Sequence, residues 1–372
     1  MASVKDSIPH IIRTAEEPRQ QGVWSARLSK VDQVNSKIRL LRLSLPKDGP
    51  PLRHLPGQYV DLYIPNIDVV GGFTITSPPQ ASVQSQEDPH IELAIQDSPS
   101  NPPAAYLWRP VSDILDSTVS FRVGGSFVYP PPTLKREERE RIDRVVFVAG
   151  GVGINPIMSM ISAMHEAGAN RLGGMPMEVS VLYSARREKN AETDQEEDIL
   201  FATRLADIAH HWKHHVQVNF RYTQFITGVK SEEPTDRSEA RRSFAAAIKT
   251  RFPDRPEISD QYSQIMQNYV SRSPNTVSWR NTYSQLSRLF NSAGAPDLLE
   301  RYNEIDSGPG VQPTQYRRIQ EHDLEEALGP EDRRDTVIVY VCGLPAMTDQ
   351  FVAWFRTQRG MEEKRVLCEK WW

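Results

Sequence analysis

The sequence predicts two domains: an N-terminal antiparallel barrel of six strands, then an α/β domain whose parallel sheet carries helices on both faces. Two observations support this fold class. Residues 23–129 contain many short β-rich runs bounded by Gly, Pro or Ser, a pattern typical of a small closed barrel. From Val145 onward, apolar runs alternate with helical stretches, which is typical of a parallel sheet wound with helices.

We expect four parts along the chain. Residues 1–20 are polar with two prolines, which predicts a flexible N-terminal tail. Residues 21–133 form the barrel and residues 134–372 the α/β domain, with a proline run and a charged stretch linking them. A polar insertion at about 228–316, rich in Ser, Arg, Asn and Gln, interrupts the second domain. Its sparse apolar residues predict a partly disordered or weakly helical segment.

In the barrel half, each element has its own signal. The run Pro56-Gly-Gln-Tyr-Val-Asp-Leu-Tyr-Ile-Pro65 starts with a Pro-Gly turn and then alternates apolar residues with others, which favours a strand with one buried face. Similar runs predict two strands within 23–45 and further strands at 71–78, 90–96 and 119–129. A short helix is expected at 104–108.

In the second half, the apolar run Val145–Ala149 predicts a strand that is buried on both faces. Further strands are expected at 178–184, 216–222, 337–342 and 366–368, and helices near 157–165, 198–210 and 347–358. The insertion has possible helices near 239–249, 261–269 and 283–290. Ligands of a doubly wound sheet bind beyond the carboxyl ends of its strands.

Composition limits the possible functions. The chain has 372 residues, enough for two or three domains. Its net charge of −4 argues against a nucleic-acid partner, and no apolar run is long enough to span a bilayer. The start lacks the apolar core of a secretion signal, and only two cysteines are present. We therefore expect an intracellular protein, cytoplasmic or mitochondrial and not secreted, of open oligomeric state.

A glycine-dense turn follows the first strand of the α/β half. Gly150, Gly151 and Gly153 let the backbone approach a ligand closely, and Pro156 opens the helix that follows. A strand, a glycine turn and a helix N-terminus together hold an anionic group on backbone N–H donors. The alternative is an ordinary tight turn between a strand and a helix.

Taken together, several segments resemble the ferredoxin–NADP reductase superfamily, and most closely its eukaryotic oxidoreductase-NAD-binding-domain-containing proteins. The segments that carry this resemblance are Pro56–Val60, Gly72-Phe-Thr-Ile-Thr-Ser77, Gly124-Gly-Ser-Phe127, Ala149-Gly-Gly-Val-Gly-Ile-Asn-Pro156 and Cys342-Gly-Leu-Pro-Ala-Met347. The resemblance covers about residues 20–227 and 317–372. It implies a flavin-binding barrel of the FAD-binding FR type and a Rossmann-like second domain.

The resemblance also implies an activity. Members of this superfamily are flavoprotein oxidoreductases that pass a hydride between a nicotinamide and a flavin, followed by electron transfer to a partner. The implied cofactors here are NAD or NADP, and FAD or FMN. The sequence holds no cysteine set for an iron–sulfur cluster, so the electron acceptor is expected to be a separate, unidentified molecule. The alternative is a nucleotide-binding sensor or assembly factor with a degraded flavin site.

On this resemblance, the nicotinamide nucleotide contacts two glycine turns. The implied contacts are Gly150, Gly151, Val152, Gly153, Pro156, Cys342, Gly343 and Met347. Cys342 would lie beside the nicotinamide as a catalytic residue, although a buried structural cysteine is the alternative. Ser184 and Arg186 or Arg187, which follow the second strand, are candidates for a 2′-phosphate, and the choice between NAD and NADP stays open because Glu188 is close by.

The flavin contacts implied by the resemblance are Gly72, Phe73, Thr74, Thr76, Ser77, Gly124, Gly125 and Ser126. Thr74 is also a catalytic candidate. The last three would approach a flavin phosphate, or alternatively only turn the last strands of the barrel. The family pattern has arginine and tyrosine where this chain has Gly71 and Phe73, while Thr74 keeps a hydroxyl for the flavin ring. Pro102 and Pro103 remove two N–H donors from a second phosphate-binding element. Both departures weaken the expected flavin site, and Phe73 has the alternative role of a core aromatic.

The C-terminus supplies two further candidates. The chain ends Leu367-Cys-Glu-Lys-Trp-Trp372, and the resemblance implies that Trp372 or Trp371 covers the flavin while Glu369 acts beside the reacting atoms. The alternative for the tryptophans is structural docking against the barrel. His210, His211, His214 and His215 have helical spacing that suits zinc. No third ligand type lies nearby, so no metal site is predicted.

Overall fold

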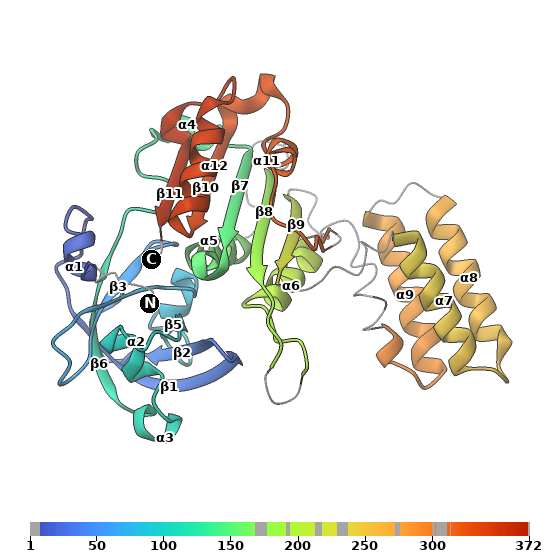
Figure 1. Ribbon diagram of the computed structural model, residues 1–372, viewed down its shortest axis with the longest axis horizontal. Coiled ribbons are helices and arrows are strands. Elements are labelled where there is room, and N and C mark those ends of the chain that lie inside the picture. The colour runs from blue at the N-terminus through green and yellow to red at the C-terminus, as the bar shows by residue number, and fades with distance from the viewer. Residues whose placement is uncertain are drawn as a thin grey trace, which may run out of the picture.

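The computed structural model confirms the predicted fold class: an antiparallel sheet of six strands precedes a parallel sheet of five strands with helices (Figure 1). The structure describes residues 8–167, 177–190, 194–212, 218–228, 237–271, 276–299, 302, 311–312 and 314–370. For residues 237–241, 269–271, 276–281 and 283, it describes the backbone alone.

The barrel is closed. Its strands are β1 (Trp24–Asn35), β2 (Ile38–Ser44), β3 (Tyr59–Tyr63), β4 (Gly71–Thr74), β5 (His90–Gln96) and β6 (Thr118–Gly124). They lie in the order β4-β3-β6-β1-β2-β5, and a bridge between Ile75 and Leu93 joins the two outer strands. Three short helices, α1 (His10–Arg13), α2 (Pro102–Leu107) and α3 (Val111–Ile114), accompany the barrel.

Alternation along β3 sets the two faces of the barrel wall. Val60 and Leu62 belong to the apolar core, so Tyr59 and Asp61 point to the outer face. The register pairs Tyr59 with Thr74 and Asp61 with Gly72. Directly opposite residues share a face, so Thr74 and Gly72 also line the outer face, where the resemblance implies the flavin.

The parallel sheet comprises β7 (Arg144–Gly150), β8 (Met177–Arg186), β9 (Val218–Thr227), β10 (Val337–Gly343) and β11 (Val366–Lys370), in the order β11-β10-β7-β8-β9. All residues of β10 and all of β7 except the last are buried. This burial confirms the expectation for Val145–Ala149, because helices cover both faces of a doubly wound sheet.

Helices α5 (Ile154–Glu166) and α6 (Ala202–Trp212) pack on one face of the sheet, against an apolar cluster that includes Phe147 and Val179. On the other face, α11 (Glu321–Leu328) and α12 (Pro345–Thr357) pack against a cluster that includes Val146 and Val148. The short α4 (Arg136–Glu140) precedes β7. None of the helices in the described part of the chain is long and apolar enough to cross a membrane.

The insertion contains three helices with a core of their own. Figure 1 shows α7 (Arg237–Arg251), α8 (Pro256–Ser271) and α9 (Thr276–Ser292) as a bundle set apart from both sheets. Buried aromatic and aliphatic residues, among them Phe244, Tyr262 and Phe290, fill its centre. The described helices are more regular than the weakly helical segment that the sequence predicts. Their large apolar side chains pack together in one core, which stabilises all three helices. Beyond the bundle, Val311 and Gln315 bridge to β9 in parallel.

The N-terminal segment differs from the flexible tail that the sequence predicts. In the described residues from 8 onward, α1 packs against β4, and Gln20 donates its backbone N–H to Val123 of β6 at 2.9 Å. Arg19 is bridged to Gly124. The polar composition of this segment suggested disorder, but its polar groups find buried partners on the barrel.

Hydrogen bonds join the two domains where α5 meets the barrel. The Asn155 side chain donates to the carbonyl of Ala94 at 3.1 Å, and the Ser159 hydroxyl donates to the carbonyl of Ser77 at 2.8 Å. Farther along, the Tyr340 hydroxyl donates to the carbonyl of Val128 at 2.9 Å. The barrel thus faces the edge of the parallel sheet from which the two predicted glycine turns emerge (Figure 1).

Candidate functional site

The carboxyl ends of the central strands form a row along one edge of the parallel sheet. The register places Gly150 of β7 beside Ser184 of β8, and Gly343 of β10 beside Lys370 of β11. A Cβ added to Gly343 would lie 3.2 Å from the Gly150 Cα, so the two glycines lie back to back. The structure therefore brings the predicted glycine turns together, as expected for one ligand held by both.

The first turn leads into α5 with its glycines in two different roles. A Cβ on Gly153 would lie 2.3 Å from the carbonyl oxygen of Cys342, so this position needs glycine for close packing. Gly151 has φ of +55° and open space around its Cβ position, so its backbone faces outward without a covering side chain. Its conformation is the left-handed one that favours glycine.

Helix α5 begins earlier than Pro156, which the sequence suggested as its start. A 3-10 turn over Gly151–Gly153 runs into the helix at Ile154. No side chain caps this N-terminus, so Val152 and its neighbours form the uncapped first turn. Backbone N–H groups at such a start suit an anion such as a diphosphate. On the other side of the row, α12 starts at Pro345, and Met347 covers Gly150 and Gly343.

Cys342 and Glu369 are paired across β10 and β11. Cys342 is fully buried within the cluster on the α5 side, which is how a small structural apolar residue behaves. Glu369 is half-buried at the same sheet edge. Of these two candidates, only Glu369 reaches the surface of the site, and Trp371 and Trp372 lie outside the described residues.

The end of β8 offers a cation at the surface. The Arg186 side chain is 73% exposed, and its Nε lies 3.4 Å from a Glu188 carboxylate oxygen. Arg187 is more enclosed and binds Glu196 at 2.6 Å. Ser184 is half-buried beside Gly150. Arg186 and Ser184 therefore stand where a nucleotide on the glycine turn would extend, while Arg187 is already engaged.

On the barrel, the Thr74 hydroxyl is a buried polar group that a ligand would satisfy. Its side chain is 1% exposed, and its hydroxyl has no hydrogen-bond partner among the residues that the structure describes. A buried hydroxyl without a partner costs about 1–3 kcal/mol. Phe73 packs against the barrel core, and a Cβ on Gly71 would meet both Phe73 and Pro103. Phe73 thus occupies the inner side of the wall, and no cation stands at Gly71.

Thr76 and Ser77 have structural partners. The Thr76 hydroxyl donates to the Glu92 carboxylate at 2.8 Å, and the Ser77 hydroxyl accepts from the Glu92 backbone N–H at 3.0 Å. Arg204 of α6 holds the same carboxylate at 2.8 Å. Burial alone would raise the pKa of Glu92, but the bonds from Arg204 and Thr76 lower it. These predicted flavin contacts serve the contact between the domains in this structure.

The N-terminal segment occupies the turn that follows β6. Gly125 donates its N–H to the carbonyl of Pro18 at 2.9 Å, and the Ser126 hydroxyl donates to Glu17 at 2.6 Å. Gly124 is bridged to Arg19. All three residues that the resemblance assigned to a flavin phosphate therefore contact residues 17–19.

A buried cluster on the outer barrel face escaped the sequence analysis. The Asp61 carboxylate binds His10 at 2.9 Å, Arg19 at 2.8 Å and Arg122 at 2.9 Å. Burial would raise the pKa of Asp61, but these three partners lower it to about 2. The only signal in the sequence was a carboxylate within the alternating run of β3, which by itself suggests no partner.

The histidines do not form a described metal site. His165 and His211 meet edge to face with ring centroids 4.8 Å apart, while His214 and His215 lie outside the described residues. Among the residues that the structure describes, no group of three or more His, Cys, Asp or Glu side chains is arranged to hold a metal ion.

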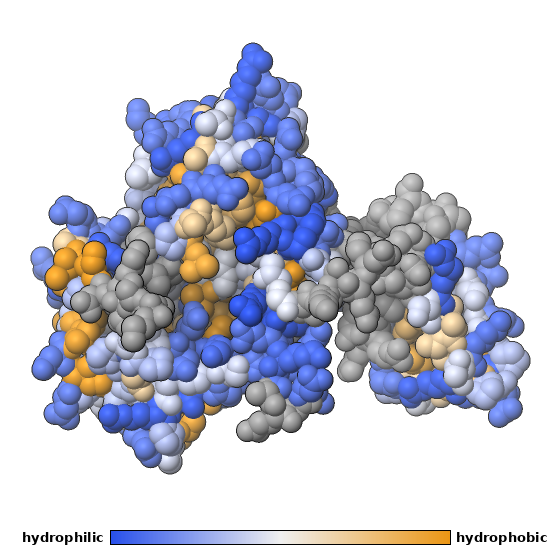
Figure 2. All heavy atoms as spheres, viewed as in Figure 1, coloured by the Kyte–Doolittle hydropathy of each residue, from blue (hydrophilic) through white to orange (hydrophobic). Residues whose placement is uncertain are grey.

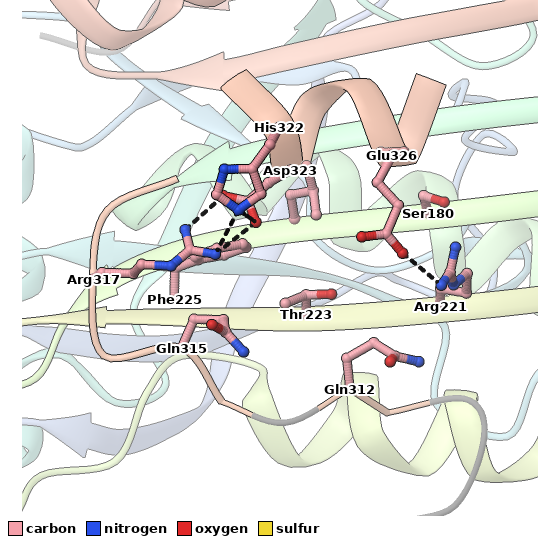
Figure 3. A pocket seen from close by; sticks show the side chains of 12 residues that line it. Ser180, Arg221, Thr223, Phe225, Gln312, Gln315, Arg317, His322, Asp323 and Glu326 are labelled. Atoms are coloured by element: carbon pink, nitrogen blue, oxygen red, sulfur yellow. Dashed lines mark hydrogen bonds and ion pairs between the residues drawn. The ribbon is translucent and has the colours of Figure 1, made fainter. Parts of the chain in front are cut away.

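A separate polar hollow of about 220 Å³ lies between β9 and α11 (Figure 3). Arg221 binds Glu326 there at 2.8 Å, and Arg317 binds Asp323 through two hydrogen bonds. Within each ion pair the positive charge of the arginine is neutralised by the carboxylate. None of the glycine-turn residues lines this hollow, so it is distinct from the candidate nucleotide site.

Comparison with known proteins places this geometry in a class. No protein-family model matches the chain. The fold resembles that of the Amycolatopsis cytochrome P450 reductase, with a TM-score of 0.53, 15% identity, and coverage of 95% of this chain and 70% of that one. The molecule thus has the ferredoxin reductase-like fold of FAD- and NAD-binding proteins.

Sequence relatives narrow the class. The chain is 32% identical over 227 residues to oxidoreductase NAD-binding domain-containing protein 1 of Danio rerio. This match covers 60% of this chain and 76% of that protein. It is 29% identical over 273 residues to the Pongo abelii protein of the same name. That match covers 71% of this chain and 81% of the Pongo abelii protein. The chain belongs to the family of oxidoreductase NAD-binding domain-containing protein 1. The resemblance found in the sequence is confirmed.

Proposed function

We propose that this protein is an NAD(P)H-dependent flavin oxidoreductase that delivers electrons to a separate acceptor. The observation that carries the proposal is the pair of back-to-back glycine turns, Gly150–Gly153 and Gly343, at the sheet edge that faces the barrel. The fold and the family support a redox role. Hydride transfer then depends on whether the α/β domain holds the nicotinamide nucleotide against a flavin on the barrel.

The nicotinamide nucleotide fits the sheet edge. Gly151 leaves open space above an uncapped helix start, where backbone N–H groups and the helix dipole attract a diphosphate. The 2′-end of the nucleotide would extend along β8 toward Ser184 and Arg186. The nicotinamide end would lie toward Gly343 and Glu369, because these residues stand on the opposite side of the turn.

For the flavin, the ring fits better than the phosphates. The unpartnered Thr74 hydroxyl, buried on the outer barrel face, matches a polar atom of a flavin ring. When bound, a flavin takes up the hydride of NAD(P)H and releases electrons one at a time. Thr74 would hold the ring, and Glu369 would supply a carboxylate that holds or moves a proton at the sheet edge. Gly71 supplies no charged side chain for the phosphates, and Pro102 and Pro103 supply no backbone N–H.

This weakness favours a second candidate, a nucleotide-binding sensor or assembly factor that has lost the flavin. A charge-assisted hydrogen bond contributes about 1.5–3 kcal/mol, so the missing arginine alone removes one to two orders of magnitude of affinity.

An absorbance experiment separates the two candidates. Purified protein is incubated with FAD or FMN, freed of unbound flavin, and mixed anaerobically with NADH or NADPH. The reductase predicts a retained yellow flavin band that bleaches on mixing. Protein that binds NADH but retains neither flavin, and does not bleach flavin left in excess, would contradict the reductase and support the sensor.

A further inference from the structure

The N-terminal segment, residues 10–20, covers both barrel elements that the proposed function assigns to the flavin. The His10 ring fills the space in front of Gly72: a Cβ on that glycine would lie 2.0 Å from His10 Nδ1. Any side chain at position 72 would therefore expel the ring. Glycine at position 72 is therefore required by the His10 ring of the same chain.

At the other element, the same segment runs along β6. Residues 17–19 contact Gly124, Gly125 and Ser126 through a bridge and two hydrogen bonds. These contacts engage the N–H of Gly125 and the hydroxyl of Ser126, both of which are donors for a phosphate. The segment thus occupies the turn as well as the strand.

Across the domain boundary, α1 reaches the α/β half. Arg13 is near enough to Glu369 for the two charges to interact: burial lowers the pKa of Arg13, and the Glu369 charge partly offsets this. In Figure 1, α1 lies at the outside of the barrel, where it packs against β4. Helix α1 therefore carries both His10, which fills the space at Gly72, and Arg13, whose charge interacts with that of Glu369.

The Thr74 hydroxyl shows what this arrangement leaves unsatisfied. Thr74 shares the outer face with Tyr59, whose ring meets the His10 ring edge to face at 5.0 Å. The Thr74 hydroxyl is enclosed, yet no residue in the described part of the chain bonds to it. The docked segment contacts the neighbours Gly72 and Tyr59 but supplies no hydrogen bond to Thr74, which a ligand shaped for that face would supply.

Opening the segment does not leave Asp61 without a cation. Arg122 belongs to β6 of the barrel itself and binds Asp61 at 2.9 Å. If residues 10–20 move away, His10 and Arg19 leave, but Arg122 stays. An unpaired buried charge would make opening very costly, and this third partner avoids it.

We propose that residues 10–20 form an intramolecular plug that competes with the flavin for the outer face of the barrel. This inference rests on the proposed function. While the plug is docked, the protein cannot bind the ring at Thr74, and the observed dissociation constant of the flavin rises in inverse proportion to the open fraction. The flavin, or a partner that draws the segment away, shifts the protein to the open state.

The test is a titration of the full-length protein with FAD and FMN, followed by flavin fluorescence. His10→Ala combined with Arg13→Ala removes both ends of the α1 contact, and Ile12→Ala is the matched control because Ile12 is 65% exposed on the same helix. The plug predicts that the double variant binds flavin at least about tenfold more tightly than the wild type. Ile12→Ala stays within twofold, at about the same affinity. Unchanged or weaker binding by the double variant would overturn the plug.

Hydrogen exchange on the wild-type protein gives a second readout that does not depend on the variants folding. The Thr14 N–H is bonded to the carbonyl of His10 at 2.9 Å, so its protection reports the docked helix. Saturating flavin should speed its exchange, and unchanged or stronger protection would show that the segment is a fixed wall of the site. If no variant binds either flavin while NADH still binds, the proposed function itself fails and the plug with it.

Discussion

His10 and Asp61, 51 residues apart in the chain, lie in a hydrogen bond of 2.9 Å between His10 Nε2 and Asp61 Oδ1. The Asp61 side chain is fully enclosed, and its three partners, His10, Arg19 and Arg122, come from two separate segments. This contact attaches the start of the chain to the barrel wall. It also gives the molecule a measurable dependence on the Asp61 charge.

Replacing Asp61 by Asn should lower the free energy of unfolding by about 3 kcal/mol, because the buried cations lose their common partner. Urea denaturation of the two proteins at neutral pH measures this difference. The exposed pair Asp116 and Arg27 provides the control: Asp116→Asn should change stability by less than about 1 kcal/mol. Equal effects of the two substitutions would show that the cluster is not structural.

The same carboxylate predicts a pH dependence. Its pKa falls from 3.8 to about 2 on folding, so its stabilisation is present above pH 3.8 and is lost as the pH drops through about 2. The wild type should therefore lose about 2 kcal/mol of its advantage over Asp61→Asn between pH 4 and pH 2. An advantage that stays constant across this window would contradict the assignment.

Arg186 is predicted to distinguish NADPH from NADH. Its exposed guanidinium stands beyond β8 near Ser184, so Arg186→Ala should weaken NADPH binding about tenfold and leave NADH binding unchanged. Arg187→Ala is the neighbouring control, because that side chain is engaged with Glu196. Calorimetric titration with both nucleotides measures the effect. If NADPH binds Arg186→Ala as tightly as it binds the wild type, the arginine does not contact a 2′-phosphate.

Glu369 is predicted to act in the reaction and not in binding. Glu369→Gln should slow the bleaching of bound flavin by NAD(P)H about a hundredfold while leaving NAD(P)H affinity unchanged, because general acid–base groups contribute at least that much. Anaerobic stopped-flow absorbance gives the rate. Glu363→Gln, at a residue whose side chain is 77% exposed, should bleach at the wild-type rate. A full-speed Glu369→Gln would remove Glu369 from the mechanism.

The insertion should unfold without affecting the site. Leu286 is fully buried in the core of the α7–α9 bundle, so Leu286→Ala should destabilise that bundle by about 3 kcal/mol. Hydrogen exchange should quicken in α7–α9 and stay unchanged in β7 and β10, and NADH affinity should not change. Loss of NADH binding would show instead that the bundle and the sheet form one cooperative unit.

The fold was largely predictable because its signals are local. The alternation in Pro56–Pro65 and the apolar run Val145–Ala149 each indicate a strand from neighbouring residues alone. The Gly150–Gly153 turn likewise predicts the start of a helix, although that helix begins at Ile154 and not at Pro156. Its role in nucleotide binding stays a prediction.

The N-terminal segment was not predictable in this way. Helix α1 has only four residues, too few for any periodicity, and its contact from His10 to Asp61 joins distant parts of the chain. The bundle of the insertion was underestimated for a related reason: Phe244, Tyr262 and Phe290 stand far apart in sequence and meet only in three dimensions. Burial of Cys342 likewise depends on how α5 packs against β10.

The most direct test of the account compares two glycines by calorimetric titration with NADH and NADPH. Gly151 and Gly294 both have positive φ, +55° and +73°, and both have open space around the Cβ position, so an alanine strains each backbone in a similar way. Only Gly151 stands at the proposed diphosphate site. We expect Gly151→Ala to weaken nucleotide binding at least about tenfold and Gly294→Ala to leave it unchanged. Wild-type affinity in Gly151→Ala would contradict nucleotide binding at this turn.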